Sequence, residues 1–408
     1  MEKVHITNRF QFLARLHLFT GIHFLYCMAG YQTLPAQHHQ HLSENCATAD
    51  SGQKTGQNVR ILFWNVENLF DNRDDTLIAD EEFTWNGAMR WTYTKLRIKL
   101  AHVAKVILAA GEWDPPAIIG LCEVENRYVL NKLAYNSPLK TLNYRIIHQD
   151  SPDQRGIDVA MLYRSDAFIP LITEWISIRF PFDTAVQTRE ILYVKGLLLQ
   201  RDTIHLFINH WPSRRGGEAV SAPRRNYVAS ALRKKVDSII QSAVCSLQST
   251  DSNHITSSPH HLITSSPNHH ITTSPHHHPF IVIMGDFNDE PENESLKTIL
   301  RARLDTCELK PCDLVNILSM KAGRAGSYKF REHWGLLDQF IVSGSLLDTD
   351  NSLHICLSSV QIFNPGFLLE DDLRYLDKKP KRTFLGPRYK GGFSDHLPII
   401  MEIRKLGN

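Results

Sequence analysis

The sequence predicts an α/β fold in one large domain, and three observations support this prediction. Apolar runs rich in β-branched residues, such as residues 280–284 (FIVIM), are typical of buried strands. Apolar residues at helical spacing occur between such runs, as at Leu96, Leu100, Val103 and Ile107. Polar motifs end apolar runs near both ends of the chain, so both ends must contribute to one folded unit.

The individual elements can be placed in chain order. Strands are predicted at residues 60–65 and 118–121, with strands of a second sheet at residues 144–148, 159–163, 191–199 and 204–209. Helices are predicted over residues 93–110, from residue 128 onward and over residues 222–242. Residues 71–91 are acidic and aromatic and are predicted to form a loop. This alternation favours two sheets buried against each other with helices outside.

Composition excludes some classes of function. The net charge of the 408-residue chain is +2, so it is not a polycation that coats nucleic acid over its whole surface. Local basic pairs occur at residues 214–215, 224–225, 378–379 and 381–382, where they either steer phosphates toward a site or form a solvated face. The seven cysteines lack the spacing of a zinc site.

The N-terminus predicts an export signal over residues 1–36. Lys3, Arg9 and Arg15 precede an apolar stretch at residues 16–30, which is short for a membrane span. An apolar tail or a wrongly chosen start codon is the alternative. A polar linker is predicted at residues 37–58, the folded domain at residues 59–405, and no transmembrane span in the mature chain.

A low-complexity insertion interrupts the domain at about residues 246–279. Within it an eight-residue unit repeats, with Thr256, Thr264 and Thr272 in equivalent positions. Its Ser, Thr, His and Pro residues cannot build a core, so we predict a disordered loop. The loop either has no role or binds transition metals through its histidines.

The motif Gly285-Asp286-Phe287-Asn288 follows the apolar run at residues 280–284. Side chains two residues apart in extended backbone point the same way, so Asp286 and Asn288 should lie together. Phosphate-ester hydrolysis needs such a pair, because a carboxylate can position water or hold a metal and an amide can donate to a phosphoryl oxygen.

Other apolar runs end in the same manner. Acidic, amide or imidazole residues close the segments 61–68, 118–126, 206–210 and 393–400, and Asp338 lies within the apolar segment 336–342. If these strands end at one edge of the sheets, their polar residues form a single acidic site that contains histidine.

In their order along the chain, these motifs resemble the endonuclease/exonuclease/phosphatase superfamily, which includes deoxyribonuclease I. They span about residues 60–403 and resemble the exported bacterial branch most, through the segments NVENLFD (65–71) and GGFSDHLP (391–398). The resemblance implies a four-layer α/β/β/α sandwich. It also implies a periplasmic, cell-surface or secreted location in a bacterium.

The resemblance implies a role for each polar residue of the site. Glu123 would be the principal ligand of Mg²⁺ or Mn²⁺, with Asn65, Glu67 and Asp395 beside it. Asp286 would orient or deprotonate water, Asn288 would donate to the scissile phosphate, and Asp338 would orient a catalytic His396. His210 would be a second catalytic histidine. The side chains proposed to bind phosphate or flank the substrate pocket are Ser213, Arg214, Trp334 and Arg388.

The functional hypothesis is a magnesium- or manganese-dependent hydrolase of phosphate esters, first of all a phosphodiesterase or endonuclease acting on nucleic acid. One alternative is a phosphomonoesterase or a lipid or inositol head-group phosphoesterase on the same scaffold. The other is a catalytically silent binding module. No stable protein partner is implied, and a monomer is expected.

Overall fold

The computed structural model describes residues 57–251, 278–319 and 326–405. The predicted signal peptide, most of the linker and residues 252–277 of the predicted insertion lie outside these ranges. Gln57 and Asn58, assigned above to the linker, already belong to the first strand. None of the helices in the described ranges is long and apolar enough to cross a membrane.

Two seven-stranded sheets form the centre of the domain. The first has the order β14-β20-β1-β2-β4-β3, with β15 also paired to β20. Its strands are β1 (Gln57–Leu69), β2 (Ile118–Val124), β3 (Tyr144–His148), β4 (Asp158–Arg164), β14 (Leu353–Ile355), β15 (Gln361–Ile362) and β20 (Ile399–Lys405). Strands β1 and β2 are parallel, and β4 is antiparallel to β2.

The second sheet has the order β5-β6-β7-β8-β13-β10-β9. Its strands are β5 (Phe168–Ile176), β6 (Ile191–Leu198), β7 (Asp202–His210), β8 (Phe280–Asp286), β9 (Ala302–Arg303), β10 (Leu314–Asn316) and β13 (Asp338–Ser343). Strands β7 and β8 are parallel, whereas β13 is antiparallel to β8.

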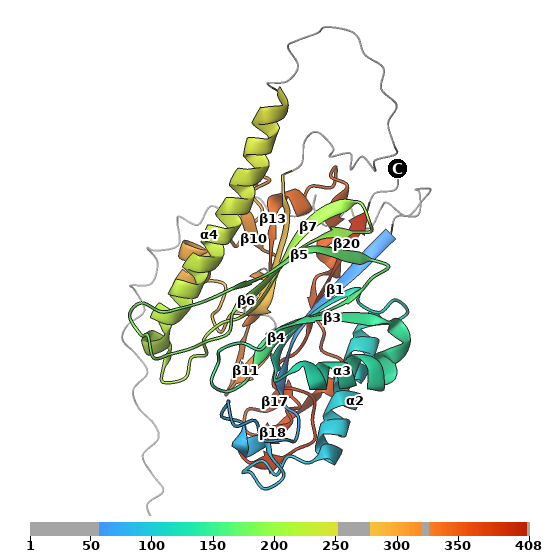
Figure 1. Cartoon of the computed structure of the whole chain (residues 1–408), viewed down its shortest axis with the longest axis vertical. Coiled ribbons are helices and arrows are strands. Elements are labelled where there is room, and N and C mark those ends of the chain that lie inside the picture. Colours follow the sequence, from blue (N-terminus) through green and yellow to red (C-terminus); the bar gives the residue numbers. More distant parts are fainter. Residues whose placement is uncertain (1–56, 252–277, 320–325, 406–408) are drawn as a thin grey trace, which may run out of the picture. The chain divides into compact units, whose positions relative to one another are not determined.

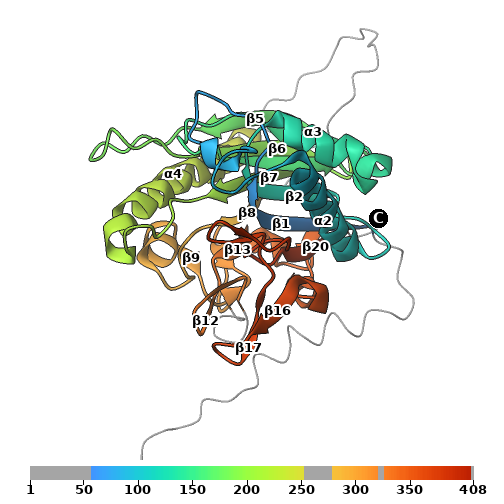
Figure 2. The ribbon, with the colours of Figure 1, turned by 90° about the horizontal axis from the view of Figure 1, so that it is seen from below.

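Helices cover the outer faces of both sheets. Figures 1 and 2 show α2 (Tyr93–Gly111) and α3 (Arg127–Asn136) on the side of the first sheet, and α4 (Glu218–Asp251) on the side of the second. Helix α2 begins as predicted, because the Thr92 hydroxyl accepts a hydrogen bond from Lys95 N–H. Asn126 caps α3 in the same way. The fold is therefore the predicted four-layer α/β/β/α sandwich.

The remaining elements are short. Three two-stranded hairpins are β11 (Tyr328–Phe330) with β12 (His333–Gly335), β16 (Leu369–Asp372) with β17 (Asp377–Pro380), and β18 (Phe384–Leu385) with β19 (Arg388–Tyr389). Single helical turns are η1 (Glu81–Phe83), η2 (Pro138–Leu142), η3 (Ser295–Ile299), η5 (Gly344–Leu346), η6 (Leu357–Ser359) and η7 (Gly366–Leu368).

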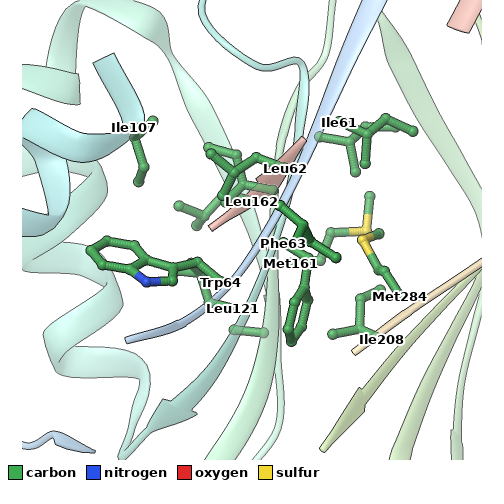
Figure 3. Close-up of a cluster of buried hydrophobic side chains, with 14 of the residues drawn as sticks. Ile61, Leu62, Phe63, Trp64, Ile107, Leu121, Met161, Leu162, Ile208 and Met284 are labelled. Atoms are coloured by element: carbon green, nitrogen blue, oxygen red, sulfur yellow. The ribbon is translucent and has the colours of Figure 1, made fainter. Parts of the chain in front are cut away.

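Side chains alternate between the layers, as strand geometry requires. On β8, Val282 and Met284 pack between the two sheets, whereas Ile281 and Ile283 pack against the helical side of the second sheet. Figure 3 shows the same alternation on β1, where Phe63 lies beside Met284 and neighbouring Trp64 points toward α2. Residues buried on both faces explain why these strands are continuous apolar runs in the sequence.

One prediction about the sheets is wrong. Residues 144–148 and 159–163 were assigned to the second sheet with residues 191–199 and 204–209, but as β3 and β4 they belong to the first sheet. Strand β4 pairs with β2 from Ile118↔Tyr163 onward. Apolar patterning identifies a strand but not its partner, because pairing between distant segments depends on tertiary packing.

Other boundaries also differ from the prediction. Strand β5 was not predicted; Pro170 and several exposed side chains interrupt its pattern, which is tolerated because it is an edge strand. Helix α4 begins at Glu218 rather than residue 222 and continues to Asp251, so it includes the first residues of the predicted insertion. Pro223 lies inside this helix near its start.

Gly285 illustrates the packing just before the Asp286 motif. A Cβ added at this position would lie 2.6 Å from the carbonyl oxygen of Asn209 on the neighbouring strand β7. Backbone atoms cannot retreat within a paired sheet, so only glycine fits here.

We expect Gly285→Ala to lower the free energy of unfolding by about 1–3 kcal/mol, the usual cost of overpacking. Gly366→Ala is a matched control, because a Cβ added at that position would have no other atom within 4 Å. Denaturant unfolding of the two variants measures the difference; equal stabilities would contradict the steric argument.

Candidate active site

Strand pairing brings the polar motifs to one edge of the two sheets. Asp286 at the end of β8 pairs with His210 at the end of β7 and with Asp338 at the start of β13. In the facing sheet, Asn65 on β1 pairs with Cys122 on β2, directly before Glu123. Residues that are distant in sequence therefore lie at the same edge of the sheets, because the pairing of their strands aligns them.

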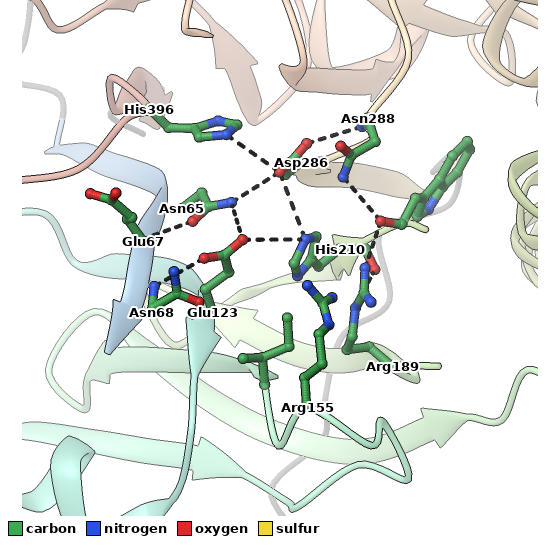
Figure 4. Close-up of polar contacts among 12 residues, drawn as sticks. Asn65, Glu67, Asn68, Glu123, Arg155, Arg189, His210, Asp286, Asn288 and His396 are labelled. Atoms are coloured by element: carbon green, nitrogen blue, oxygen red, sulfur yellow. Dashed lines mark hydrogen bonds and ion pairs between the residues drawn. The ribbon is translucent and has the colours of Figure 1, made fainter. Parts of the chain in front are cut away.

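Asn65 connects the two sheets at the centre of the site. Its Nδ2 donates to Glu123 Oε1 (3.2 Å) and to Asp286 Oδ2 (3.0 Å), as Figure 4 shows. Its Oδ1 accepts the backbone N–H of Glu67 at 2.9 Å, which fixes the orientation of the amide. Asn65 therefore presents nitrogen to the carboxylates, and this geometry does not support the prediction that it is a metal ligand.

Two imidazoles flank the Asp286 carboxylate. Oδ2 lies 3.8 Å from His210 Nε2 and 3.8 Å from His396 Nε2. The His210 Nε2 atom is also 3.9 Å from Glu123 Oε1. Five of the predicted residues thus meet around one small space, namely Asn65, Glu123, His210, Asp286 and His396.

His396 is held by a second carboxylate. Its Nδ1 donates to Asp338 Oδ2 at 2.7 Å. Its loop is fixed by Trp64, whose Nε1 donates to the His396 carbonyl oxygen at 2.9 Å, and by the Ser394 hydroxyl, which donates to Asn65 O at 2.7 Å. Burial disfavours the charged imidazolium, but the Asp338 and Asp286 carboxylates outweigh it and raise the pKa of His396 well above its usual value.

The protonation of His210 is opposite to that of His396. Burial, together with the charges of Arg189 and Arg155, lowers the pKa of His210 well below its usual value. The imidazole is therefore neutral near pH 7. Its Nδ1 is buried and lacks a hydrogen-bond partner within the described ranges.

Asp286 holds a proton more readily than a surface carboxylate. Burial raises the pKa of Asp286 to about 7, and the Asp338 charge acts in the same direction, while His396 opposes it. A carboxylate with a pKa near the working pH is well suited to accept a proton.

Several residues around the site have a positive backbone φ angle, which residues other than glycine rarely adopt. Glu67 (φ 51°), Asn68 (φ 53°), Glu123 (φ 61°) and Asn288 (φ 51°) all have positive φ. Such residues cost about 1–3 kcal/mol each and cluster at functional sites. Glu67, Asn68 and Glu123 lie where the pairing register of β1 and β2 shifts, and Asn68 N–H donates to Glu123 Oε2 at 2.9 Å.

The arrangement fits a divalent cation beside Glu123. Within the part of the chain that the structure describes, no lysine or arginine forms an ion pair with the Glu123 or Asp286 carboxylate. Neutral His210 offers a further lone pair nearby. Magnesium retains several waters and needs only one or two carboxylates, so Glu123 with Asp286 next to it provides enough negative charge.

Glu67 and Asp395, the other two predicted ligands, each form an ion pair with the same arginine. Arg382 donates through Nε to Glu67 Oε1 (3.2 Å) and through Nη2 to Asp395 Oδ2 (2.9 Å). Thr383 N–H also donates to Glu67 Oε2 at 2.6 Å. The prediction that they bind a metal ion together with Glu123 is not supported, because a guanidinium already binds both carboxylates.

The predicted phosphate-binding residues are engaged in structural contacts or lie away from the cluster. Arg214 donates to the Asn288 carbonyl oxygen at 2.7 Å and to Asn293 Oδ1 at 3.1 Å, so it supports the loop after β8. Asn288 itself donates through Nδ2 to Trp211 O. Trp334 bonds to Asp377, and Arg388 is exposed on β19. Among the described residues, neither these two nor Ser213 contacts the central cluster.

Several cationic residues of the site were not predicted. Figure 4 shows Arg155 and Arg189 approaching His210 from the loops after β3 and β5. Arg189 is buried and donates to the carbonyl oxygens of His210 (3.2 Å) and Trp211 (2.6 Å). Lys99 is buried under the site and lies on the apolar face of α2, where a lysine is rare enough to have been a signal.

Comparison with known proteins identifies the family of the chain. A family model described as Endonuclease/Exonuclease/phosphatase family matches residues 60–246 and 256–405. The chain therefore belongs to this family of hydrolases, as the sequence motifs predicted.

Solved structures of the family are similar to this chain at low identity. An endonuclease/exonuclease/phosphatase family protein from Bacteroides thetaiotaomicron is 12% identical over 86% of this chain and 99% of its own, with a TM-score of 0.46. A mannosyl-6-phosphatase from the same species is 13% identical (85% and 99% covered, TM-score 0.46). The catalytic domain of human nocturnin is 14% identical (85% and 97% covered, TM-score 0.45). No curated protein matches the sequence significantly.

Proposed function

We propose that the protein is a divalent-metal-dependent phosphodiesterase that cleaves nucleic acid by direct attack of water on phosphorus. The observation that carries this proposal is the Asp286 carboxylate between two imidazoles of opposite protonation, each 3.8 Å away. Neutral His210 and protonated His396 on either side of a carboxylate with a raised pKa are suited to move and donate protons around a phosphate.

Each residue has a defined task in this mechanism. Asp286 accepts a proton from the attacking water. His396, kept protonated by Asp338, donates a hydrogen bond to a phosphoryl oxygen as negative charge develops there. Glu123 would hold the cation, which would neutralise charge on the phosphoryl group. Asn65 holds Glu123 and Asp286 in position by donating a hydrogen bond to each carboxylate.

A groove beside the site supports nucleic acid as the substrate. It has a volume of about 800 Å³, within the range of small-molecule sites, and is lined by residues 149–152 and by the loop 177–190. Both loops leave the same edge of the sheets as the catalytic residues. Arg189 connects them to the site, because it donates to Asp153 (2.8 Å) and to His210 O (3.2 Å).

The lining of the groove suits a nucleoside. Gln149, Ser151 and Gln187 can form hydrogen bonds, while Ile178 and Val186 provide apolar surface for a base. The lining also includes two acidic residues, Asp150 and Glu190, and one basic residue, Arg179, so its charged side chains sum to a net negative charge. A base can enter only when it is unpaired, so we expect a preference for single-stranded nucleic acid.

The test compares substrates on one preparation of the full chain with Mg²⁺ or Mn²⁺, with and without chelator. We expect cleavage of single-stranded oligonucleotides to exceed nicking of plasmid, and both to disappear with chelator and in His396→Ala. We further expect Gln187→Ala to raise KM about 3–10-fold for the oligonucleotide, the effect of one lost hydrogen bond. It should leave kcat/KM unchanged for a small diester such as bis(p-nitrophenyl) phosphate, which cannot reach the groove.

Release of inorganic phosphate from monoesters without any diester cleavage would overturn the proposal. That outcome would instead identify a phosphomonoesterase on the same scaffold.

A further inference from the structure

A second pair of acidic residues lies beside the pair Glu123 and Asp286. Its negative charge is compensated by a cationic side chain of the protein itself. Glu67 (3% exposed) and Asp395 share the guanidinium of Arg382, with nitrogen–oxygen distances of 3.2 Å and 2.9 Å. In Figure 4 the Glu67 carboxylate points away from Glu123 and Asp286. If the Arg382 guanidinium were absent, these two carboxylates could bind a second metal ion in its place.

A second cation, Lys99, lies buried beneath this pair. Its Nζ donates to Thr383 Oγ1 and to Phe393 O, both at 2.5 Å, and so fixes both ends of the segment between Arg382 and Asp395. Glu67, Asp395 and, more weakly, Glu123 lie within its electrostatic reach. Two negative and two positive side chains thus form a cluster without net charge, whereas neither Glu123 nor Asp286 forms an ion pair with a lysine or arginine among the described residues.

The guanidinium is not fully used by its carboxylate partners. Arg382 donates through Nε and Nη2, whereas Nη1 has no partner among the residues described, and 38% of the side chain is exposed. Tyr328, whose ring packs on His396 at a centroid distance of 4.7 Å, lies within electrostatic reach of both Arg382 and Asp286. Because Arg382 binds Asp395, the residue directly before His396, its guanidinium lies near the loop that positions His396.

We propose that Arg382 takes the place of a second metal ion. The site would bind one divalent cation at Glu123, and Arg382 would supply the second positive charge, binding a phosphoryl oxygen through Nη1 while Glu67 and Asp395 hold it in position. An arginine is suited to this role because it stays protonated and presents several donors in a fixed plane. The inference depends on the proposed function only for the phosphoryl contact.

The first experiment measures metal binding without turnover. Mn²⁺ titration of the full chain, followed by calorimetry and by electron paramagnetic resonance, should give one tight site per chain. Glu123→Gln should weaken it at least 10-fold, whereas Glu67→Gln should change Kd less than 3-fold. Two tight Mn²⁺ ions in the wild type, or equal losses in the two variants, would overturn the proposal.

The second experiment removes the guanidinium. Arg382→Met leaves two carboxylates without their cation, so it should gain a second Mn²⁺ site, whereas Arg382→Lys should keep one. Arg374→Gln changes an exposed arginine on the turn between β16 and β17; it is the control and should behave as wild type. If Arg382→Met does not fold, the wild-type stoichiometry and the Glu67→Gln comparison still decide the question.

Diester hydrolysis reports on the phosphoryl contact. Arg382→Lys should lower kcat/KM at least 10-fold with unchanged Mn²⁺ affinity, because lysine keeps the charge but loses the planar donors. Unchanged kcat/KM would show that Arg382 only positions carboxylates. If no diester is cleaved by the wild type, the proposed function fails while the metal stoichiometry stands as an independent result.

Discussion

Asp286→Asn is expected to lower kcat for a phosphodiester about 10²–10⁴-fold, the usual contribution of a general base. Asn has almost the same shape as Asp, but it cannot accept the proton of the attacking water. Asp286 accepts hydrogen bonds from Asn65 Nδ2 (3.0 Å) and from Asn288 N–H (3.0 Å), and the amide oxygen of Asn can keep one of them, so the local geometry should change little. Steady-state kinetics at saturating Mg²⁺ measures this effect.

Stability gives an independent check on the same variant. Burial raises the pKa of Asp286 to about 7, so the folded state binds a proton there that the unfolded chain has lost above about pH 4. Ionised Asp286 therefore costs stability as pH rises from about 4 toward 7 and above. Asp286→Asn removes this cost, and its melting temperature at pH 8 should equal or exceed that of the wild type in the absence of metal.

Asp350→Asn is the matched control, because it makes the same chemical change on an exposed turn. It should retain wild-type kcat. If Asp286→Asn kept more than a tenth of wild-type kcat, or if its activity fell only because the protein unfolded, the site would have been placed wrongly.

The fold could be predicted largely from local patterns. The segments around Asn65, Glu123 and Asp286 are buried on both faces, so their apolar runs are long and end abruptly at polar residues. The two sheets could not be separated in this way, because β3 and β4 carry the same kind of pattern as β6 and β7. Only the pairing of β4 with β2 assigns them to the first sheet.

The centre of the site was predictable for the same reason as the strands. His210 and Asp286 are the last residues of β7 and β8, and Asn65 and Glu123 lie where the register shifts near the ends of β1 and β2, so position along the strand determines position in space. Asp338 could be recognised as unusual because a charge rarely occurs inside an apolar run.

The contacts around that centre could not be predicted. Arg382 and Asp395 belong to a hairpin region without long periodic elements, and the ion pair that takes Glu67 away from Glu123 spans 315 residues of sequence. Arg155 and Arg189 reach His210 from two separate loops, and loop conformation depends on contacts that no local pattern records. The sequence therefore indicated which acidic residues belong to the site, but not which cationic side chain each of them would bind.

Asp338→Asn is expected to have the second large effect, and the effect should depend on pH. The Asp338 and Asp286 carboxylates raise the pKa of His396 against the opposing effect of burial. Replacing Asp338 by a neutral residue should lower this pKa by about 1–3 units, the usual influence of a close opposite charge. His396 would then lose its proton at a lower pH, and with it the hydrogen bond to the phosphoryl oxygen.

The sign of the change follows from protonation. Wild-type activity should fall on the alkaline side only where His396 deprotonates, well above the usual range of a histidine, whereas in Asp338→Asn this decrease should begin near or below neutral pH. The ratio of wild-type to variant kcat should therefore grow with pH, reaching about 10²-fold or more near pH 8. His396→Ala should lack activity at every pH, because the group that donates to the phosphoryl oxygen is absent.

Linkage predicts the same direction for stability. A histidine with a raised pKa stabilises the folded state fully below its unfolded pKa of about 6.5, and this contribution is lost as pH rises through the folded value. The difference in melting temperature between wild type and Asp338→Asn should thus be largest below about pH 6.5 and shrink at alkaline pH, while the difference in activity grows. A kcat ratio that stays constant from pH 6 to pH 9 would mean that Asp338 orients the imidazole without controlling its charge. Asp338 would then be a positioning residue, and the protonated state of His396 would depend on Asp286 alone.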